Sequence, residues 1–413
     1  MLAVCGIGCL PFQFETPYRI QLAPSDLFVA IGCLVTVIGR NRLQRSSNNS
    51  ALLGLWLAVT ISLGTTLSRT GTLSRYALLN KYSGLLWLFA LYWFFANAVD
   101  HEEDVRWLMK VFVIVVSLQN CVCLAVYIGA RWFGLFIPLF ELGPRLEGFL
   151  VDPNAYGGLV ACALGLHLLT YRSSAQLVQG KAGVWVLVTL VAGLLFTFSR
   201  SAGLACLAIV STGMFLRARV VLPAVAFLAA TGAAYWIYGA GTADRSFIES
   251  MLTRQKQVDQ RVDIASRALE DFAKYPVLGT GIGTVRETII HNTSLWFLAE
   301  MGLVGFAALC WFLGSTAGKA VFCVRNGGTQ IRTIAIALLC AHAGMFVLSM
   351  GIEAFYQRHW WFVMSMIAAL ATILDRNRAR LSVGCVRPRW NPTAGSAQGS
   401  ASCVLRMRKV SWP

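Results

Sequence analysis

The chain has 413 residues, of which 57% are hydrophobic and only 13% are charged. Soluble domains carry about 25% charged residues, so this composition excludes an ordinary soluble enzyme. The formal net charge of +16 would suggest a nucleic-acid partner in a soluble protein, but basic residues beside apolar runs report membrane topology first.

Apolar runs recur along the whole chain at lengths near the ~20 residues that cross a bilayer. In chain order, spans are predicted near residues 1–14, 26–39, 51–68, 82–99, 105–128, 155–171, 182–198, 202–216, 219–239, 294–317, 331–351 and 359–374. The first run has no basic residues ahead of it, so it is interpreted as part of a span and not as a removable signal. The expected fold is an all-α polytopic membrane protein with about twelve transmembrane helices.

Four regions follow from this pattern. N-terminal transmembrane helices occupy 1–240, a polar outer loop 241–293, and C-terminal transmembrane helices 294–374. The tail, 375–413, is rich in Arg, Pro, Ser and Gly, and is predicted to be disordered, cytoplasmic and in contact with membrane lipids. With the tail inside, alternation assigns every other loop to a side. A modest majority of Lys and Arg then lies inside, which is the usual bias.

The first outer segment with chemical character is RLEGFLVDPNAYG, which contains Arg145, Asp152 and Asn154. Asp-Pro-Asn is typical of a turn that caps a following helix. The second is FTFSRSAG, where Ser199 and Arg200 lie in a very short turn between two apolar runs. Arg200 is either an arginine that extends to the membrane interface or a guanidinium pre-positioned to hold a phosphate.

The third segment is RVDIASRALEDFAKYPVLGTGIG. Its first part has helical spacing, with one apolar face made of Val262, Ala265, Leu269 and Phe272. It is too polar to span and predicts an amphipathic helix at the outer surface, carrying Arg261 and Arg267. Gly279 and Gly281 then give flexible backbone that a pyrophosphate could approach. No strand precedes this glycine pair, so a dinucleotide-binding motif is excluded.

The fourth segment is HNTSLWFLAEMGLVG, where His291 and Asn292 begin an apolar span. Asn292 suits a helix N-cap. A histidine titrates near neutrality and can act as a base at physiological pH. Glu300, nine residues further, is predicted to point away from His291 and to pair inside the helix bundle. Gly302 and Gly305 would permit close helix packing.

Topology alone puts Arg145, Arg200, Arg261 and His291 on one side of the membrane, from four separate loops. Positive charge on the translocated side runs against the usual bias, so it indicates a ligand. The expectation is an outward-facing site for a dianionic, lipid-embedded ligand with one histidine that can take a proton.

These motifs, in this order, resemble the O-antigen ligase and O-antigen polymerase superfamily of bacterial envelope glycosyltransferases. The resemblance lies in His-Asn followed by Gly-x-x-Gly, the Ser-Arg turn, Arg261 ahead of YPVLGTGIG, the Arg…Asp-Pro-Asn segment, and APSDLF at 23–28. It covers roughly residues 23–310. Ala265 departs from the family pattern, in which many members carry Trp.

The resemblance implies a GT-C-like bundle with a large periplasmic loop in the bacterial inner membrane. It implies a glycan donor on undecaprenyl pyrophosphate, transfer to an acceptor hydroxyl on the periplasmic side, and no cofactor or metal. Arg200 and Arg261 would stabilise the diphosphate leaving group, and His291 would be the general base. The substrate-binding residues would be Arg145, Asp152, Asn154, Ser199, Arg267, Asn292, Gly279 and Gly281.

Three functions remain open at this stage. A ligase transfers the glycan to a lipid A–core sugar, and the His-Asn…Gly-x-x-Gly spacing favours this one. A polymerase of O-antigen or exopolysaccharide transfers it to a second lipid-linked glycan. A transporter or flippase of an anionic lipid-linked glycan would need facing charges at mid-membrane and paired repeats of broken helices, and no internal repeat is evident.

Overall fold

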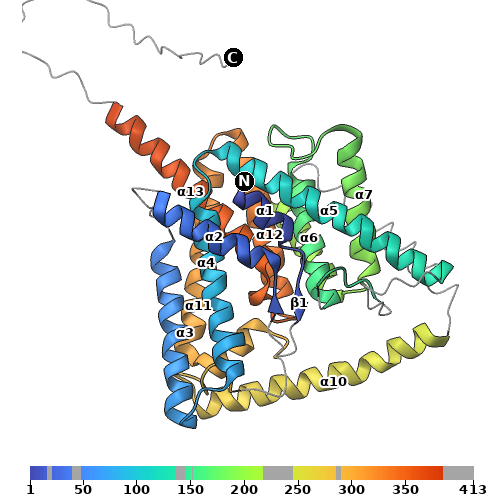
Figure 1. Ribbon diagram of the computed structural model, residues 1–413, viewed down its shortest axis with the longest axis vertical. Coiled ribbons are helices and arrows are strands. Elements are labelled where there is room, and N and C mark those ends of the chain that lie inside the picture. The colour runs from blue at the N-terminus through green and yellow to red at the C-terminus, as the bar shows by residue number, and fades with distance from the viewer. Residues whose placement is uncertain are drawn as a thin grey trace, which may run out of the picture. The chain divides into compact units, whose positions relative to one another are not determined.

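The computed structural model describes residues 1–15, 21–39, 48–134, 145–150, 152–216, 245–284 and 290–384. These residues fold almost entirely as helices (Figure 1). The exception among them is an antiparallel pairing of β1 (Phe14–Glu15) with β2 (Gln21–Leu22), in which Phe14 lies opposite Leu22. The predicted all-α class is confirmed apart from this small hairpin.

The helical elements follow the predicted spans closely. They are α1 (Leu2–Cys9), α2 (Pro24–Gly39), α3 (Asn49–Thr70), the π-helical η1 (Tyr76–Tyr82), α4 (Ser83–Asn97), α5 (Glu102–Phe133), α6 (Pro153–Thr170), α7 (Gly180–Phe196), α8 (Arg200–Phe215), α10 (Arg245–Lys274), α11 (Thr293–Asn326), α12 (Thr329–Leu348), the 3-10 turn η2 (Ala354–Tyr356) and α13 (Arg358–Gly384). Each predicted span on described residues overlaps a helix, although in the first, 1–14, only Leu2–Cys9 is helical and Phe14 lies in β1. The span predicted at 219–239 lies outside the described residues.

Four helices in the described part of the chain are long and apolar enough to cross a membrane. They are α3, α5 up to Ala130, α11 and α12, while α2, α7 and α8 are apolar but shorter. Large apolar side chains such as Leu118, Trp185 and Leu207 are exposed on the outside of the bundle, as a lipid-facing surface requires. The chain is a multi-pass membrane protein, and the count of twelve spans stays a prediction.

Helix α6 is the centre of the bundle. Every residue from Tyr156 to Thr170 is buried, because α5, α7, α8 and α12 all pack against it. Helix α11 packs against α3 and α12, and α10 contacts α11 while running across the end of α3 and not alongside it (Figure 1). Helices α6, α8, α11 and α12 therefore form one packed group, and α10 lies at its edge.

The amphipathic helix is present, but its packed face is rotated from the predicted one. Ala268 is buried and Ile264 is half-buried, whereas Val262 and Leu269 are 57% and 50% exposed. Of the predicted apolar face, Ala265 and Phe272 are half-buried, whereas Val262 and Leu269 are exposed. The packed face of α10 is therefore centred on Ala268 and includes only part of the predicted one.

Loops that alternation assigns to the same side contact each other. On the predicted outer side, Lys81 pairs with Glu353, and Arg69 donates to the Gly279 carbonyl. On the predicted inner side, Asn48 donates to Thr316. The residues from Asp375 onward form a separate unit, of which the structure describes 375–384, the end of α13.

Candidate functional site

Three helices begin with capping residues that the sequence predicts as part of the site. The Asp152 carboxylate accepts from the Asn154 amide at 3.1 Å and caps α6. Ser199 Oγ accepts from the Ala202 amide at 3.2 Å and caps α8. Asn292 Oδ1 accepts from the Leu295 amide at 3.1 Å and caps α11. Short polar side chains satisfy the free amides of a first turn, which explains these three residue types.

Asn154 joins the start of α6 to the start of α8. Its Oδ1 accepts from Arg145 Nη2 and from Ser199 Oγ, both at 2.9 Å. Its Nδ2 donates to Asp152 Oδ1 at 2.9 Å. Four residues predicted for substrate binding thus form one hydrogen-bonded group, which also fixes the donor and acceptor ends of the Asn154 amide.

The turn that carries Arg200 is held from the same group. Arg145 Nε donates to the Thr197 carbonyl at 2.9 Å, and the Leu146 amide donates to the Phe196 carbonyl at 3.0 Å. The next residue, Phe198, adopts a φ of 49°, which is an uncommon conformation for an aromatic residue. This constrained turn is what places Arg200 as the first residue of α8.

The start of α11 is linked to the start of α8 by the turn after α12. Asn292 Nδ2 donates to the Met350 carbonyl at 3.2 Å. A Cβ at the next residue, Gly351, would lie 3.0 Å from the Ser201 Cβ in the first turn of α8. The N-termini of α6, α8 and α11 therefore gather around one place, and their partial positive charges act together there.

His291 lies at this place, half-buried. Burial lowers its pKa from the ordinary value, and so does the nearby Arg261 cation, while the Asp152 carboxylate acts in the opposite direction. His291 is thus close to charges from α10 and from the cap of α6. A lowered pKa favours the neutral imidazole, which is the form that a proton acceptor must have.

Arg200 and Arg261 are exposed. Neither has a hydrogen-bond or ion-pair partner among the residues that the structure describes. Arg261 lies on the bundle side of α10, because it is seven residues, about two turns, from the buried Ala268. Arg267 is six residues from Arg261 and projects from a different side of the helix. The structure therefore brings Arg261, but not Arg267, to His291.

Gly279 and Gly281 lie in a segment, Tyr275–Thr284, that docks against a break in α11. The break is at Gly302, with φ 63° and ψ −161°. On one side of it, the carbonyls of Ala299 and Glu300 accept from the amides of Thr280 and Gly281, at 2.8 and 2.9 Å. The Gly281 amide is thus already used by α11, and a Cβ at Gly279 would lie 2.4 Å from the α11 backbone at Glu300 and Met301. Both glycines therefore have a structural reason and need no ligand to explain them.

The other side of the break is satisfied in the same way. The amides of Leu303 and Val304 donate to the carbonyls of Pro276 and Val277, at 2.8 and 3.2 Å. Inside a membrane protein such groups must find protein partners, which the docked segment supplies. Gly302 was expected to allow close packing between helices. Instead its non-helical backbone leaves room for the docked segment, whose Val277 and Gly279 backbone atoms lie against it.

Glu300 behaves as predicted for an acid inside the bundle. Its carboxylate accepts from Trp296 Nε1 at 2.7 Å and from the Gly283 amide at 2.9 Å. Neither contact involves His291, so Glu300 does not orient His291. The residues that sequence reasoning missed are the buried Lys81 and the largely buried Glu353, which form an ion pair beside this group. Their positions at the ends of predicted spans were the available signal, since charges there are rarely buried without a role.

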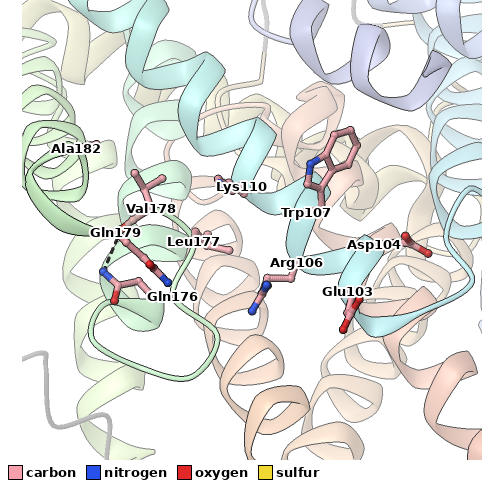
Figure 2. A pocket seen from close by; sticks show the side chains of 10 residues that line it. All are labelled: Glu103, Asp104, Arg106, Trp107, Lys110, Gln176, Leu177, Val178, Gln179 and Ala182. Atoms are coloured by element: carbon pink, nitrogen blue, oxygen red, sulfur yellow. Dashed lines mark hydrogen bonds between the residues drawn. The ribbon is translucent and has the colours of Figure 1, made fainter. Parts of the chain in front are cut away.

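A hollow of about 680 Å³ lies elsewhere, between the start of α5 and the connection from α6 to α7 (Figure 2). It is lined by both signs of charge, including Glu103, Arg106 and Lys110. None of the predicted site residues lines it, and both of its segments were assigned to the inner side. Among the described residues, no three His, Cys, Asp or Glu side chains gather as a metal site.

Comparison with known proteins gives one family. The family model described as O-antigen ligase matches residues 185–310. The match includes the Ser-Arg turn, Arg261, the docked segment, His291 and the broken helix at Gly302, and it excludes the Arg145 segment. A search of curated proteins found no match.

Proposed function

We propose that this chain, a member of the O-antigen ligase and polymerase superfamily through residues 185–310, is a membrane glycosyltransferase. The proposed reaction moves a glycan from undecaprenyl pyrophosphate to an acceptor hydroxyl at the periplasmic face of the bacterial inner membrane. The favoured acceptor is a lipid A–core sugar, which makes the protein an O-antigen ligase.

The observation that carries the proposal is the meeting of three helix N-termini beside two exposed arginines and a half-buried histidine. Helix N-termini attract anions through their free amides and dipoles. Arg200 and Arg261 add two exposed guanidinium groups without described partners. Each guanidinium group can donate two parallel hydrogen bonds to phosphate oxygens. Such a place favours a dianionic diphosphate over a neutral sugar, so the donor headgroup belongs there.

In the proposed reaction the acceptor oxygen forms a bond to the anomeric carbon as the bond from that carbon to the diphosphate oxygen breaks. The electron pair of the breaking bond leaves with undecaprenyl pyrophosphate. Arg200 and Arg261 stabilise the charge that develops on the diphosphate, which is the largest electrostatic demand of the step. The acceptor proton passes to the neutral imidazole of His291.

The remaining predicted residues divide into two groups. Arg145, Asp152, Asn154 and Ser199 hydrogen-bond to one another and so hold the Arg200 turn, and Asn292 caps the helix beside His291. Arg267, Gly279 and Gly281 are given no contact with the donor, because one projects from another side of α10 and the other two serve the docked segment.

The test is the envelope glycan profile of a deletion strain complemented with wild type or His291→Ala. A ligase predicts full-length glycan that accumulates on undecaprenyl pyrophosphate, is missing from lipid A–core, and is restored by wild type alone. Single repeat units on the core, without long chains, would make the protein a polymerase. Purified protein that moves lipid-linked glycan across liposomes but transfers no sugar would make it a transporter.

A further inference from the structure

The connection between α12 and α13, residues 349–357, lies directly against the start of α11. The Thr293 amide donates to the Ser349 carbonyl at 2.9 Å, and Thr293 Oγ1 to the Ile352 carbonyl at 3.4 Å. Asn292 Nδ2 donates to the Met350 carbonyl at 3.2 Å. Three carbonyls of this connection, those of Ser349, Met350 and Ile352, thus fix the two residues that follow His291.

Lys81 and Glu353 hold this connection in place. Lys81 Nζ forms an ion pair with Glu353 Oε1, and their side chains are only 8% and 13% exposed. Lys81 belongs to η1, far from the connection in sequence. Tyr356 Oη adds a second bond, to the Lys81 backbone carbonyl at 2.9 Å. Both interactions tie the middle of the connection to one residue.

Aromatic rings couple the same lysine to α11. Lys81 Nζ lies 4.6 Å from the Trp296 ring and 5.0 Å from the Tyr356 ring, and these two rings are 5.3 Å apart. Trp296 lies one helical turn after Asn292 and donates to Glu300. An ammonium enclosed by rings in this way is attracted to their faces. A shift of Lys81 would therefore move both the connection and the first turn of α11.

A buried ion pair is a costly way to stabilise a fold. Desolvation of the two charges offsets their attraction, so an apolar pair of the same size is often as stable. Removing one partner, in contrast, leaves an uncompensated charge that drives local rearrangement. The pair thus fixes geometry more than it adds stability.

We propose that Lys81 and Glu353 are positioning residues for the transfer reaction, because they hold the 349–357 connection that orients His291. The inference rests on the proposed function, in which His291 takes the acceptor proton. Neither residue contacts the substrate. Their effect passes from the ion pair to the carbonyls of residues 349, 350 and 352, and from these to Asn292 and Thr293.

The experiment measures transfer kinetics of the purified full-length chain in lipid nanodiscs, with Glu353→Gln, Lys81→Met and the exchanged pair K81E/E353K. We expect kcat to fall about 10²-fold in each single variant, the loss that a displacement of about 1 Å can cause. The donor KM should stay within about threefold, since the diphosphate site is intact. The exchanged pair should recover part of kcat.

The pH profile separates positioning from general weakening of the fold. Burial is the main cause of the lowered pKa of His291, with Arg261 and Asp152 as the facing charges. A loosened connection admits water, so the acid limb of kcat should move up toward the ordinary histidine value of about 6.5. Tyr356→Phe, which keeps the ring and removes only the bond to Lys81, should shift the limb in the same direction.

A double-variant cycle decides the matter. In a His291→Ala background, adding Glu353→Gln should cause no further loss of kcat, because no base remains for the connection to orient. Independent, additive losses would overturn the positioning role, as would wild-type kcat in Tyr356→Phe and Glu353→Gln. A fully active His291→Ala protein would instead contradict the proposed function, so the two failures are distinguishable.

Discussion

The break in α11 makes a quantitative prediction for Gly302→Ala. Gly302 has φ 63° and ψ −161°, a backbone region that is essentially restricted to glycine and costs other residues about 1–3 kcal/mol. An added Cβ would also lie 2.5 Å from the Gly279 amide nitrogen and from the Val277 carbonyl carbon. Backbone atoms cannot rotate away, so the docked segment must move.

That movement breaks two hydrogen bonds, from the amides of Leu303 and Val304 to the docked segment. Each contributes about 0.5–1.5 kcal/mol, so together with the strain the free energy of unfolding should fall by roughly 2–6 kcal/mol. Because the segment follows α10 directly, Arg261 should shift with it. Transfer activity should therefore fall together with stability.

The assay is thermal unfolding in detergent followed by tryptophan fluorescence, with transfer activity measured on the same samples. The matched control is Gly314→Ala in the same helix, where nothing lies within 4 Å of an added Cβ. That variant should be neutral or stabilised by up to about 1 kcal/mol, as helix propensity predicts. Equal melting temperatures for the two variants would refute the role given to the break.

Three further predictions concern the site. Arg200→Ala should lower kcat about 10²–10³-fold with an unchanged melting temperature, because the side chain is exposed; a parallel loss of folded protein would argue against a catalytic effect. Arg261→Ala should raise the pKa of His291, because it removes a cation that disfavours protonation of the imidazole. The acid limb of kcat/KM should then move to higher pH. Arg267→Ala, on another side of α10, should leave the limb unmoved, and an equal shift would contradict the placement of Arg261. Asn154→Ala should lower stability by about 1–3 kcal/mol, because its buried and partly buried partners lose their bonds, and denaturant unfolding measures this directly.

The helices were predictable because bilayer length and apolarity set them, and the capping residues were predictable because few side chains satisfy a first turn. Asp152, Ser199 and Asn292 all cap as their types suggest. That these three helix starts meet could not be read from spacing, since it depends on how α6, α8, α11 and α12 pack. The sequence could indicate only a common side of the membrane.

Three features show where local pattern fails. Leu269 and Phe272 fit one apolar helical face, but the packing of α10 is centred on Ala268, so Phe272 is half-buried and Leu269 is exposed. Gly279 suggested the approach of a ligand and Gly302 suggested helix packing. In the structure, Gly279 makes room for the backbone of α11, and Gly302 makes room for the backbone of the docked segment. Lys81 and Glu353 are 272 residues apart, a separation at which periodicity carries no information.

The most direct test of the account is single-turnover transfer of a labelled glycan from undecaprenyl pyrophosphate, by purified protein in nanodiscs with acceptor lipid. Wild type should transfer the label and release undecaprenyl pyrophosphate in equal amounts. His291→Ala and Arg200→Ala, both well folded, should do neither at a comparable rate. Full transfer by either variant would contradict the assignment of the acceptor proton to His291 or of the diphosphate charge to Arg200.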